Sequence, residues 1–151
     1  MQHRDSEPTM NDDLRAMSDA KVRIVTGPPC SGKTTYVQTK ASKRDVIIDY
    51  DAIAVALGSP NTHDHPKSLV PYILHVRNAL LERVRDKRPT TNVWVIATSP
   101  QADELGMADE VILLETDRAT CHERADYADR PYAWHALIDT WQAPSVSHHA
   151  G

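Results

Sequence analysis

Four short, mostly apolar runs recur along the chain, and each has the length of a β-strand. They cover residues 22–27, 46–49, 92–98 and 110–115. Runs of this kind, without a regular polar alternation, are typical of parallel strands that helices cover on both faces. Segments with helical spacing lie between and after them, at residues 33–43, 51–57, 67–87, 117–125 and 132–141. Residues 99–107 are expected to form a loop or a single helical turn.

The longest helical segment, residues 67–87, has an apolar stripe. Its apolar side chains recur at steps of three and four residues, at Leu69, Ile73, Val76, Leu80, Leu81 and Val84. One face of this helix is therefore expected to be buried.

The order of these elements predicts an α/β domain over residues 21–142. Strands that alternate with helices favour a small parallel sheet, here of about four strands, joined by right-handed crossovers. Residues 1–20 and 143–151 lack apolar periodicity. We expect mobile or disordered tails there.

Composition narrows the function classes. The 151 residues carry 17 Lys and Arg against 21 Asp and Glu, a net charge of −4. This length suits one domain, and the mild acidity argues against coating nucleic acid through charge alone. Two cysteines give neither a disulfide framework nor a CxxC metal motif. No apolar run approaches the ~20 residues of a membrane span, and the polar N-terminus does not resemble a secretory signal. We expect a cytoplasmic protein that makes no membrane contact.

The strongest chemical signal is the sequence GPPCSGKT, which matches the motif GxxxxGK[ST] in full. Its glycines let backbone N–H groups curl around a phosphate at the positive end of the following helix. Lys33 is expected to reach the β- and γ-phosphates, and the Thr34 hydroxyl suits a Mg²⁺ ligand. We therefore expect ATP or another nucleoside triphosphate, with Mg²⁺, at this loop. The binding residues would be Gly27, Pro28, Pro29, Cys30, Ser31, Gly32, Lys33, Thr34 and Thr35.

Two aspartates follow the second apolar run. Asp49 ends the run, and Asp51 begins the next helix. Because the carboxyl ends of parallel strands meet at one edge, both side chains are expected beside the phosphates. A kinase needs a carboxylate there to accept the proton of an acceptor hydroxyl or to hold a metal ion. We interpret Asp51 as the acid–base residue and Asp49 as a Mg²⁺ ligand. Helix capping or a surface turn is the alternative for both.

The segment GPPCSGKTTYV, followed by a strand ending in DYD, resembles the P-loop kinases of the polynucleotide 5′-hydroxyl kinase type, which bacteriophages commonly encode. Related small phage kinases act on modified bases in DNA. The resemblance covers residues 21–142 and implies a kinase-type P-loop NTPase fold, a three-layer sandwich with a short helical lid. It also implies that Asp51 activates the acceptor hydroxyl. Two positions depart from the group's pattern: Ala54 replaces an arginine, and the third strand ends in Ile96-Ala97-Thr98-Ser99 without an aspartate.

Three arginines follow the fourth apolar run. By the resemblance, Arg124 and Arg130 belong to the lid and neutralise charge on the transferred phosphoryl group. Arg118, nearer the strand end, is expected to pack beside the adenine. The same stretch also fits a solvated helix in which acidic neighbours such as Asp126 pair with the arginines.

Residues 67–88 carry six basic against two acidic residues, a net charge of +4. One interpretation is a track for the phosphates of a nucleic acid or nucleotide, in which Arg77 is the residue of most interest. The alternative is the solvated face of an amphipathic helix.

Histidines and tryptophans offer weaker signals. His63 and His65 flank an aspartate in a loop, and the alternatives for them are substrate contact, a metal site and plain loop polarity. The three tryptophans are expected to pack against the sheet rather than to stack on bases, with Trp134 and Trp141 on one helix face.

Together these features predict an enzyme, a Mg²⁺-dependent kinase that moves the γ-phosphate of ATP to a hydroxyl of a nucleic acid. The hydroxyl would belong to a 5′ end or to a hydroxymethylated base. The catalytic residues would be Lys33, Asp51, Arg124 and Arg130. Two alternatives stay open: a kinase of a free nucleotide, nucleoside or other small molecule, and an NTPase or nucleotide-dependent switch without an acceptor.

Overall fold

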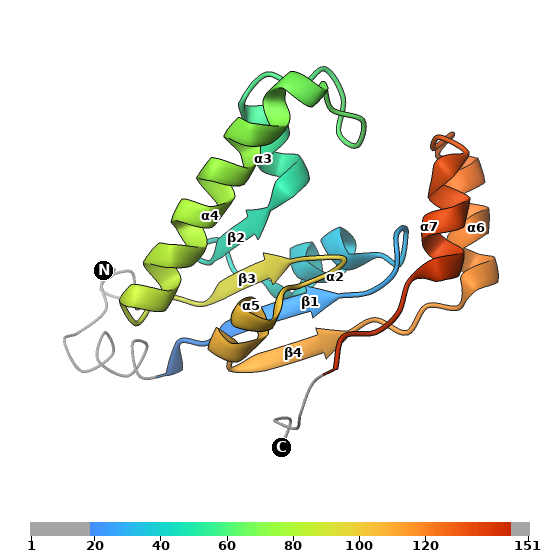
Figure 1. Cartoon of the computed structure of the whole chain (residues 1–151). Helices are drawn as coiled ribbons and strands as arrows, with labels where there is room; N and C mark the ends of the chain where they lie inside the picture. Colours follow the sequence, from blue (N-terminus) through green and yellow to red (C-terminus); the bar gives the residue numbers. More distant parts are fainter. Residues whose placement is uncertain (1–18, 146–151) are drawn as a thin grey trace, which may run out of the picture.

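The computed structural model describes residues 19–145, and a four-stranded sheet forms its centre (Figure 1). The strands are β1 (Val22–Thr26), β2 (Val46–Asp49), β3 (Val93–Ile96) and β4 (Glu110–Leu113). They lie in the order β2-β3-β1-β4, and every neighbouring pair is parallel. The predicted α/β class and the small parallel sheet are confirmed.

Helices cover both faces of this sheet. The covering helices are α2 (Lys33–Lys40), α4 (Val70–Asp86) and α5 (Ala102–Met107). On one face, Val37 of α2 packs among apolar residues of β1 and β3. On the other face, Leu81 of α4 packs among apolar residues of β1, β2 and β3, with Leu105 of α5 against the same cluster. The apolar stripe predicted for residues 67–87 therefore supplies part of the core through Ile73 and Leu81, but Leu80, which it also included, is 37% exposed.

The chain leaves β1 and β3 toward opposite faces of the sheet. After β1 it passes to α2, and after β3 it passes to α5 on the other face. Such a divergence between neighbouring strands opens a crevice at their carboxyl ends, where ligands bind in open α/β sheets. The register places Asp49 and Val25 on either side of Ile96, so three strand ends meet at this edge.

Two pairs of helices flank this edge (Figure 1). The remaining elements are α3 (Tyr50–Ala56), a 3₁₀ turn (Lys67–Leu69), α6 (Arg118–Tyr127) and α7 (Ala133–Thr140). α3 packs against α4, and α6 packs against α7 as a helical hairpin. The hairpin has a small core of its own, formed by Cys121, Ala125 and Ile138, with Cys30 packed against it.

Several element boundaries differ from those that the sequence predicts. α2 ends at Lys40 rather than at residue 43, because Ala41 is extended. α3 begins one residue early, at Tyr50, because the side chain of Asp49 caps it. Residues 102–107 form the helix α5, which is longer than the predicted single turn.

Among residues 19–145, no helix is both long and apolar enough to cross a membrane. The predicted tails, residues 1–20 and 143–151, fall mainly at residues 1–18 and 146–151, which lie outside the described residues. Residues 143–145 are described and form neither helix nor strand.

Candidate functional site

The glycine-rich loop, residues 27–34, follows β1 and leads directly into α2. Cys30 (φ 64°) and Gly32 (φ 96°) adopt left-handed backbone conformations. Between them, Ser31 N donates to Pro28 O at 3.1 Å and closes a turn. Left-handed residues of this kind turn successive N–H groups toward one concavity, and the first N–H groups of a helix have no partner within it. The loop is therefore suited to an anion.

The start of the loop is tightly packed. A Cβ at Gly27 would lie 2.6 Å from Ser31 Oγ and 3.1 Å from Leu114 O, so a larger residue would displace the loop. Ser31 Oγ is buried and has no hydrogen-bond partner among the described residues. A buried hydroxyl without a partner is costly, and a phosphate oxygen would supply one. This observation fits an anionic ligand at the loop.

The side-chain amino group of Lys33 contacts the same loop. Its Nζ donates to Gly27 O and Pro28 O at 3.0 Å each. Burial lowers the pKa of Lys33 to about 8, although nearby acidic groups such as Asp49 partly oppose that shift. A lysine with this pKa is mostly charged at neutral pH, so it can pair with a phosphate bound beside it.

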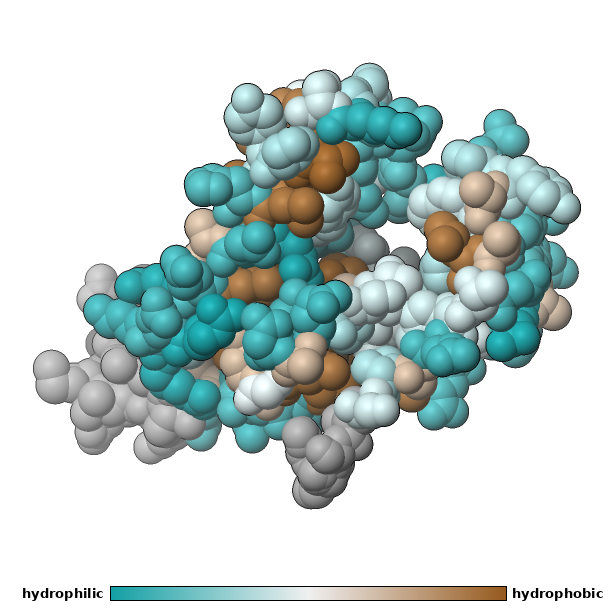
Figure 2. All heavy atoms as spheres, in the orientation of Figure 1, coloured by the Kyte–Doolittle hydropathy of each residue, from teal (hydrophilic) through white to brown (hydrophobic). Residues whose placement is uncertain are grey.

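A cleft of about 1110 Å³ opens at the carboxyl ends of the strands. The glycine-rich loop and the end of β3 form its floor. We call residues 50–86, which include α3 and α4, the first wall, and residues 118–141, which include α6 and α7, the second wall. Figure 2 shows the hollow between the two walls. Of the site residues predicted from the sequence, the cleft lining brings together residues 29–35, Asp49, Asp51 and Arg130.

The two aspartates lie where β2 passes into α3. Asp49 caps this helix, because its side chain accepts a hydrogen bond from Asp51 N at 3.3 Å. Burial raises the pKa of Asp49, and the charge of Asp51 adds to the effect. The capping alternative therefore applies to Asp49, which also lines the cleft. Asp51 belongs to the first turn of α3 and is not its cap.

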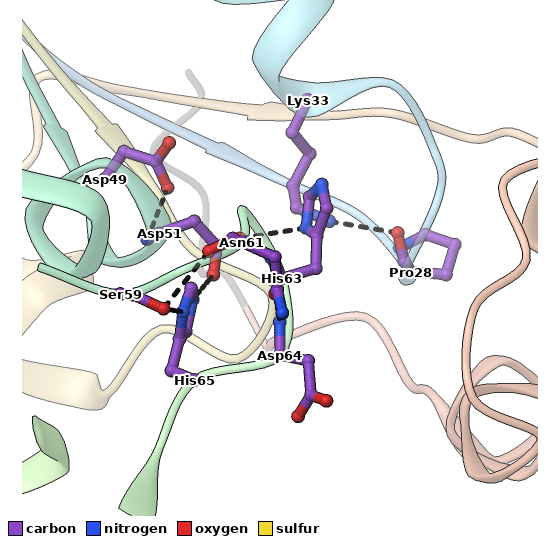
Figure 3. Close-up of polar contacts among 9 residues, drawn as sticks. All are labelled: Pro28, Lys33, Asp49, Asp51, Ser59, Asn61, His63, Asp64 and His65. Atoms are coloured by element: carbon purple, nitrogen blue, oxygen red, sulfur yellow. Dashed lines mark hydrogen bonds and ion pairs between the residues drawn. The ribbon is translucent and has the colours of Figure 1, made fainter. Parts of the chain in front are cut away.

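Two histidines contact the Asp51 carboxylate (Figure 3). His65 Nε2 lies 2.7 Å from Asp51 Oδ1, and His63 Nδ1 lies 3.3 Å from Asp51 Oδ2. Ser59 Oγ lies 2.6 Å from His65 Nδ1, on the far side of the ring. Asp64, between the two histidines in the sequence, points away from this cluster. Both histidines thus hydrogen-bond or pair with the Asp51 carboxylate, which the sequence did not predict, and His63 also lines the cleft.

Arg130 and Trp134 bring the second wall to the same cleft. The Arg130 guanidinium lies over the Trp134 ring, 5.2 Å from its centroid. Its Nε is buried and has no partner within residues 19–145. His63 meets the same ring edge-on at 5.7 Å, so the two walls approach each other here. Burial, followed by the charge of Arg130, lowers the pKa of His63, which is therefore neutral at neutral pH. Trp134 lines the cleft, which corrects the prediction that it packs against the sheet.

The other predicted arginines, Arg124 and Arg118, are absent from the cleft lining. Arg124 Nη1 donates to Cys30 O at 3.2 Å, which ties α6 to the glycine-rich loop. Arg118 is exposed at the start of α6. Asp126, a partner considered for these arginines, pairs instead with His135 at 2.9 Å.

The basic residues of α4 are largely paired with acidic residues near α5. Arg77 donates to both carboxylate oxygens of Glu104, at 2.9 and 3.2 Å. The Arg77 side chain is only 12% exposed and that of Glu104 only 8%. Arg85 forms a more exposed pair with Asp103. Arg77 is therefore paired rather than solvated, and both it and Glu104 line the cleft.

The segment that follows β3 contributes Thr98 and Ser99 to the cleft floor. Thr98 O accepts hydrogen bonds from the Thr26 hydroxyl at 3.3 Å and from Trp141 Nε1 at 2.7 Å. Trp141 follows α7 as its C-cap, so it does not share a helix face with Trp134 as predicted. Its bond to Thr98 attaches the end of the second wall to the sheet.

Within residues 19–145, no group of three or more His, Cys, Asp and Glu side chains is arranged to hold a metal ion. A Mg²⁺ ion that binds together with a triphosphate needs only one or two protein ligands. The Thr34 hydroxyl and the Asp49 carboxylate both line the cleft and offer oxygen atoms of the kind that Mg²⁺ prefers. The residues present therefore fit a Mg²⁺–nucleotide complex.

No protein-family model and no curated protein matches this chain. Two solved structures of the Pnkp1/Rnl/Hen1 RNA repair complex resemble it. The first matches with a TM-score of 0.59 at 16% identity, over 80% of this chain and 42% of that chain. The second matches with a TM-score of 0.52 at 14% identity, over 87% of this chain and 47% of that chain. This chain spans less than half the length of either, and the likeness shows a shared fold.

Proposed function

We propose that this protein is a Mg²⁺-dependent kinase that transfers the γ-phosphate of ATP to a hydroxyl of a nucleic acid, at a 5′ end or on a hydroxymethylated base. The observation that carries the proposal is that the Asp51 carboxylate and the glycine-rich loop line one cleft. An anion site alone would suit any nucleotide-binding protein. A carboxylate beside it supplies the acid–base group that transfer to an alcohol needs.

The glycine-rich loop holds the triphosphate in this proposal. Its N–H groups and the first turn of α2 bind the phosphate oxygens. Lys33 releases the carbonyl oxygens of its own loop and pairs with the β- and γ-phosphates. When bound, Mg²⁺ would neutralise charge on the triphosphate, with Thr34 and Asp49 as its protein ligands.

Asp51 and the lid arginines act on the transferred group. Asp51 accepts the proton of the acceptor hydroxyl as the hydroxyl oxygen bonds to the γ-phosphorus. The bond from that phosphorus to the β–γ bridging oxygen breaks, and ADP leaves. Arg130 stabilises the charge on the transferring phosphoryl group from the second wall. Arg124, which lies against the loop at Cys30 O, is the second arginine available for this role.

Two observations support a base-bearing acceptor. The fold resembles that of chains in an RNA repair complex. The cleft also carries half-exposed apolar side chains, Val55 and Leu74 on the first wall and Leu137 on the second, with Trp134 nearby. Such walls favour a nucleobase over a small polar alcohol. A free nucleoside or nucleotide offers the same base and is the second candidate.

Transfer of labelled phosphate from ATP tests the proposal. The acceptors are 5′-hydroxyl DNA, 5′-hydroxyl RNA, hydroxymethylated DNA, free nucleosides and free nucleotides. Labelled nucleic acid would support the proposal, and label on free nucleosides or nucleotides alone would favour the second candidate. ATP hydrolysis without any labelled acceptor would contradict both and indicate an NTPase or switch.

Substitutions then assign the residue roles. Lys33→Ala should abolish nucleotide binding or turnover, because it removes the cation beside the phosphates. Asp51→Asn should leave ATP affinity close to that of the wild type and lower transfer about 10²–10⁴-fold, the range typical of a general base. Asp64→Asn is the matched control, because Asp64 points away from the cluster. Equal losses of ATP binding and transfer in Asp51→Asn would indicate a metal-binding or structural role instead.

A further inference from the structure

The two oxygens of the Asp51 carboxylate have different surroundings. Oδ1 lies 2.7 Å from Nε2 of His65, whose side chain is 6% exposed. Oδ2 lies 3.3 Å from Nδ1 of His63, whose side chain is 30% exposed and lines the cleft. One oxygen therefore has a short, protected hydrogen bond, and the other has a long contact at the cleft.

His65 is fixed from its other side as well. Ser59 Oγ lies 2.6 Å from His65 Nδ1, and Ser59 N donates to Ala54 O at 3.0 Å. Gly58, with φ 108°, turns the chain after α3 so that the loop folds back along this helix. His65 thus bridges the first turn of α3 at Asp51 and the residue that closes its last turn.

The available hydrogens determine the direction of these bonds. An ionised Asp51 can only accept, so His65 Nε2 carries a hydrogen and donates it. The Ser59 hydroxyl has one hydrogen, and His65 Nδ1 at 2.6 Å is a closer acceptor than Asn61 O at 3.1 Å. A neutral imidazole satisfies both bonds. No second charge is needed at this buried position.

We propose that His65 is a positioning residue for the transfer step, an inference that rests on the proposed function. Its Nε2–H holds Oδ1 and thereby fixes the plane of the Asp51 carboxylate. Oδ2 is then presented to the cleft, where the acceptor hydroxyl replaces the long contact with His63. The hydroxyl proton moves to Oδ2 as the hydroxyl oxygen bonds to the γ-phosphorus. His65 is absent from the cleft lining, so it acts through Asp51 rather than on a substrate.

Two substitutions separate this role from a role in loop structure. Gln places its amide nitrogen near the position of Nε2 and keeps a donor for Asp51. Asn reaches only near the position of Nδ1 and keeps a partner for Ser59. We expect His65→Asn to lower kcat about 10–10²-fold with the KM for ATP unchanged, because a misdirected base slows transfer without weakening phosphate binding. His65→Gln should recover most of the lost kcat. An active Asn variant beside an inactive Gln variant would overturn the proposal.

A double-variant cycle gives a second readout. If His65 acts through Asp51, adding His65→Asn to Asp51→Asn should lower kcat little further. Fully additive losses would contradict the proposal. Thermal unfolding of each variant reports retention of the fold, with His75→Asn on the exposed face of α4 as the control. If His65→Asn does not fold, Ser59→Ala is used instead. This variant keeps the contact between His65 and Asp51. A loss of kcat as large as that in Asp51→Asn would therefore contradict the proposal.

The outcomes distinguish this inference from the function on which it rests. If the wild-type chain labels none of the acceptors, the proposed function fails and the inference fails with it. If transfer depends on Asp51 but falls equally in His65→Gln and His65→Asn, the inference alone fails.

Discussion

The two walls of the cleft are built differently. The first wall is anchored, since Leu81 and Ile73 of α4 are buried and Leu81 belongs to the core of the sheet. The second wall has a small core of its own and meets the glycine-rich loop through Cys30. In the proposed function, the carboxylate that directs one oxygen at the acceptor lies on the anchored wall. The arginines proposed to approach the phosphoryl group lie on the less anchored wall, which is the one suited to act as a lid.

The charges of the two walls differ in the same way. On the first wall, Arg77 is paired with Glu104, and Asp51 is held by His65. On the second wall, Arg130 Nε is buried and has no partner among the described residues, and Arg124 donates to a neutral carbonyl. On the first wall the cation is therefore paired with a carboxylate of α5, and the Asp51 carboxylate is held in place by a hydrogen bond. The second wall keeps positive charge available for an anionic ligand.

The largest expected effect tests the anchoring of the first wall. Glu104→Ala should lower the free energy of unfolding by about 3–5 kcal/mol, because it leaves the buried Arg77 unpaired. Asp103 is next to Glu104 in α5 and is the exposed partner of Arg85. Asp103→Ala should therefore lower the free energy of unfolding by less than about 1 kcal/mol. Urea unfolding of both variants provides the measurement. Similar losses of stability in the two variants would contradict the expected difference between the buried pair of Arg77 and the exposed pair of Arg85.

The next prediction concerns the second wall. Arg130→Ala should lower kcat about 10²–10³-fold, the range seen when a donor to a developing oxyanion is removed. Its unfolding free energy should change by no more than about 1 kcal/mol, because the contact that it loses is a stacking contact with Trp134. Arg44→Ala, at an exposed arginine that does not line the cleft, is the control and should leave both quantities unchanged. A large loss of stability in Arg130→Ala would show that the arginine supports the fold instead.

A smaller effect concerns Lys33, on the floor between the walls. Its pKa of about 8 in the ligand-free protein means that the charge declines as pH rises through 8, whereas the arginines of the second wall stay charged. Bound phosphate should restore the charge, so ATP binding at pH 8 should take up about half a proton, and affinity should fall about tenfold from pH 7 to pH 9. Calorimetry in buffers of different ionisation enthalpy measures both. Lys33→Arg should show neither effect, and an unchanged wild-type affinity at pH 9 would contradict the prediction.

The smallest effect tests mobility directly. In hydrogen exchange, amides of α6 and α7 should exchange faster than those of α4 around Leu81, because a small local core opens at lower free energy than the main one. A non-hydrolysable ATP analogue should slow exchange in the hairpin several-fold and leave α4 unchanged. Equal protection of the two walls in the free protein would remove the distinction between them.

The features that sequence reasoning predicts well are local ones. The strand positions follow from apolar runs such as residues 92–98, within which Val93–Ile96 form the fully buried strand β3. The glycine-rich loop is recognisable because the motif GxxxxGK[ST] is defined by fixed residue types at fixed spacing within eight residues. Asp49 and Asp51 could be placed at the cleft because the carboxyl ends of parallel strands meet at one edge of a sheet. That inference requires only that the strand before them is predicted correctly.

The features that it misses depend on chain reversals. His65 lies 14 residues from Asp51 and reaches it only because Gly58 and Ser59 turn the loop back along α3. Arg77 and Glu104 are 27 residues apart and meet through the packing of α4 beside α5. Hydrophobic periodicity describes one helix or strand at a time, so it carries no information on pairs of residues from different elements. A histidine in a loop shortly after the candidate base is the one local signal that pointed toward the first of them.

The hydrogen bond from Trp141 to Thr98 has a mechanical consequence. The hairpin starts beside Thr116, whose hydroxyl donates to Ser31 O of the glycine-rich loop at 2.9 Å. It ends at Trp141, which donates to Thr98 O in the segment after β3, so its two ends are held by the two loops at the carboxyl ends of β1 and β3. If the contact of Arg124 with Cys30 O opens, a hairpin held at these two points can rotate about the line that joins them. Arg130 lies at the opposite end, in the turn between α6 and α7. Since α6 has 10 residues and therefore acts as a lever of about 15 Å, a rotation of roughly 10° would carry Arg130 through roughly 2–3 Å.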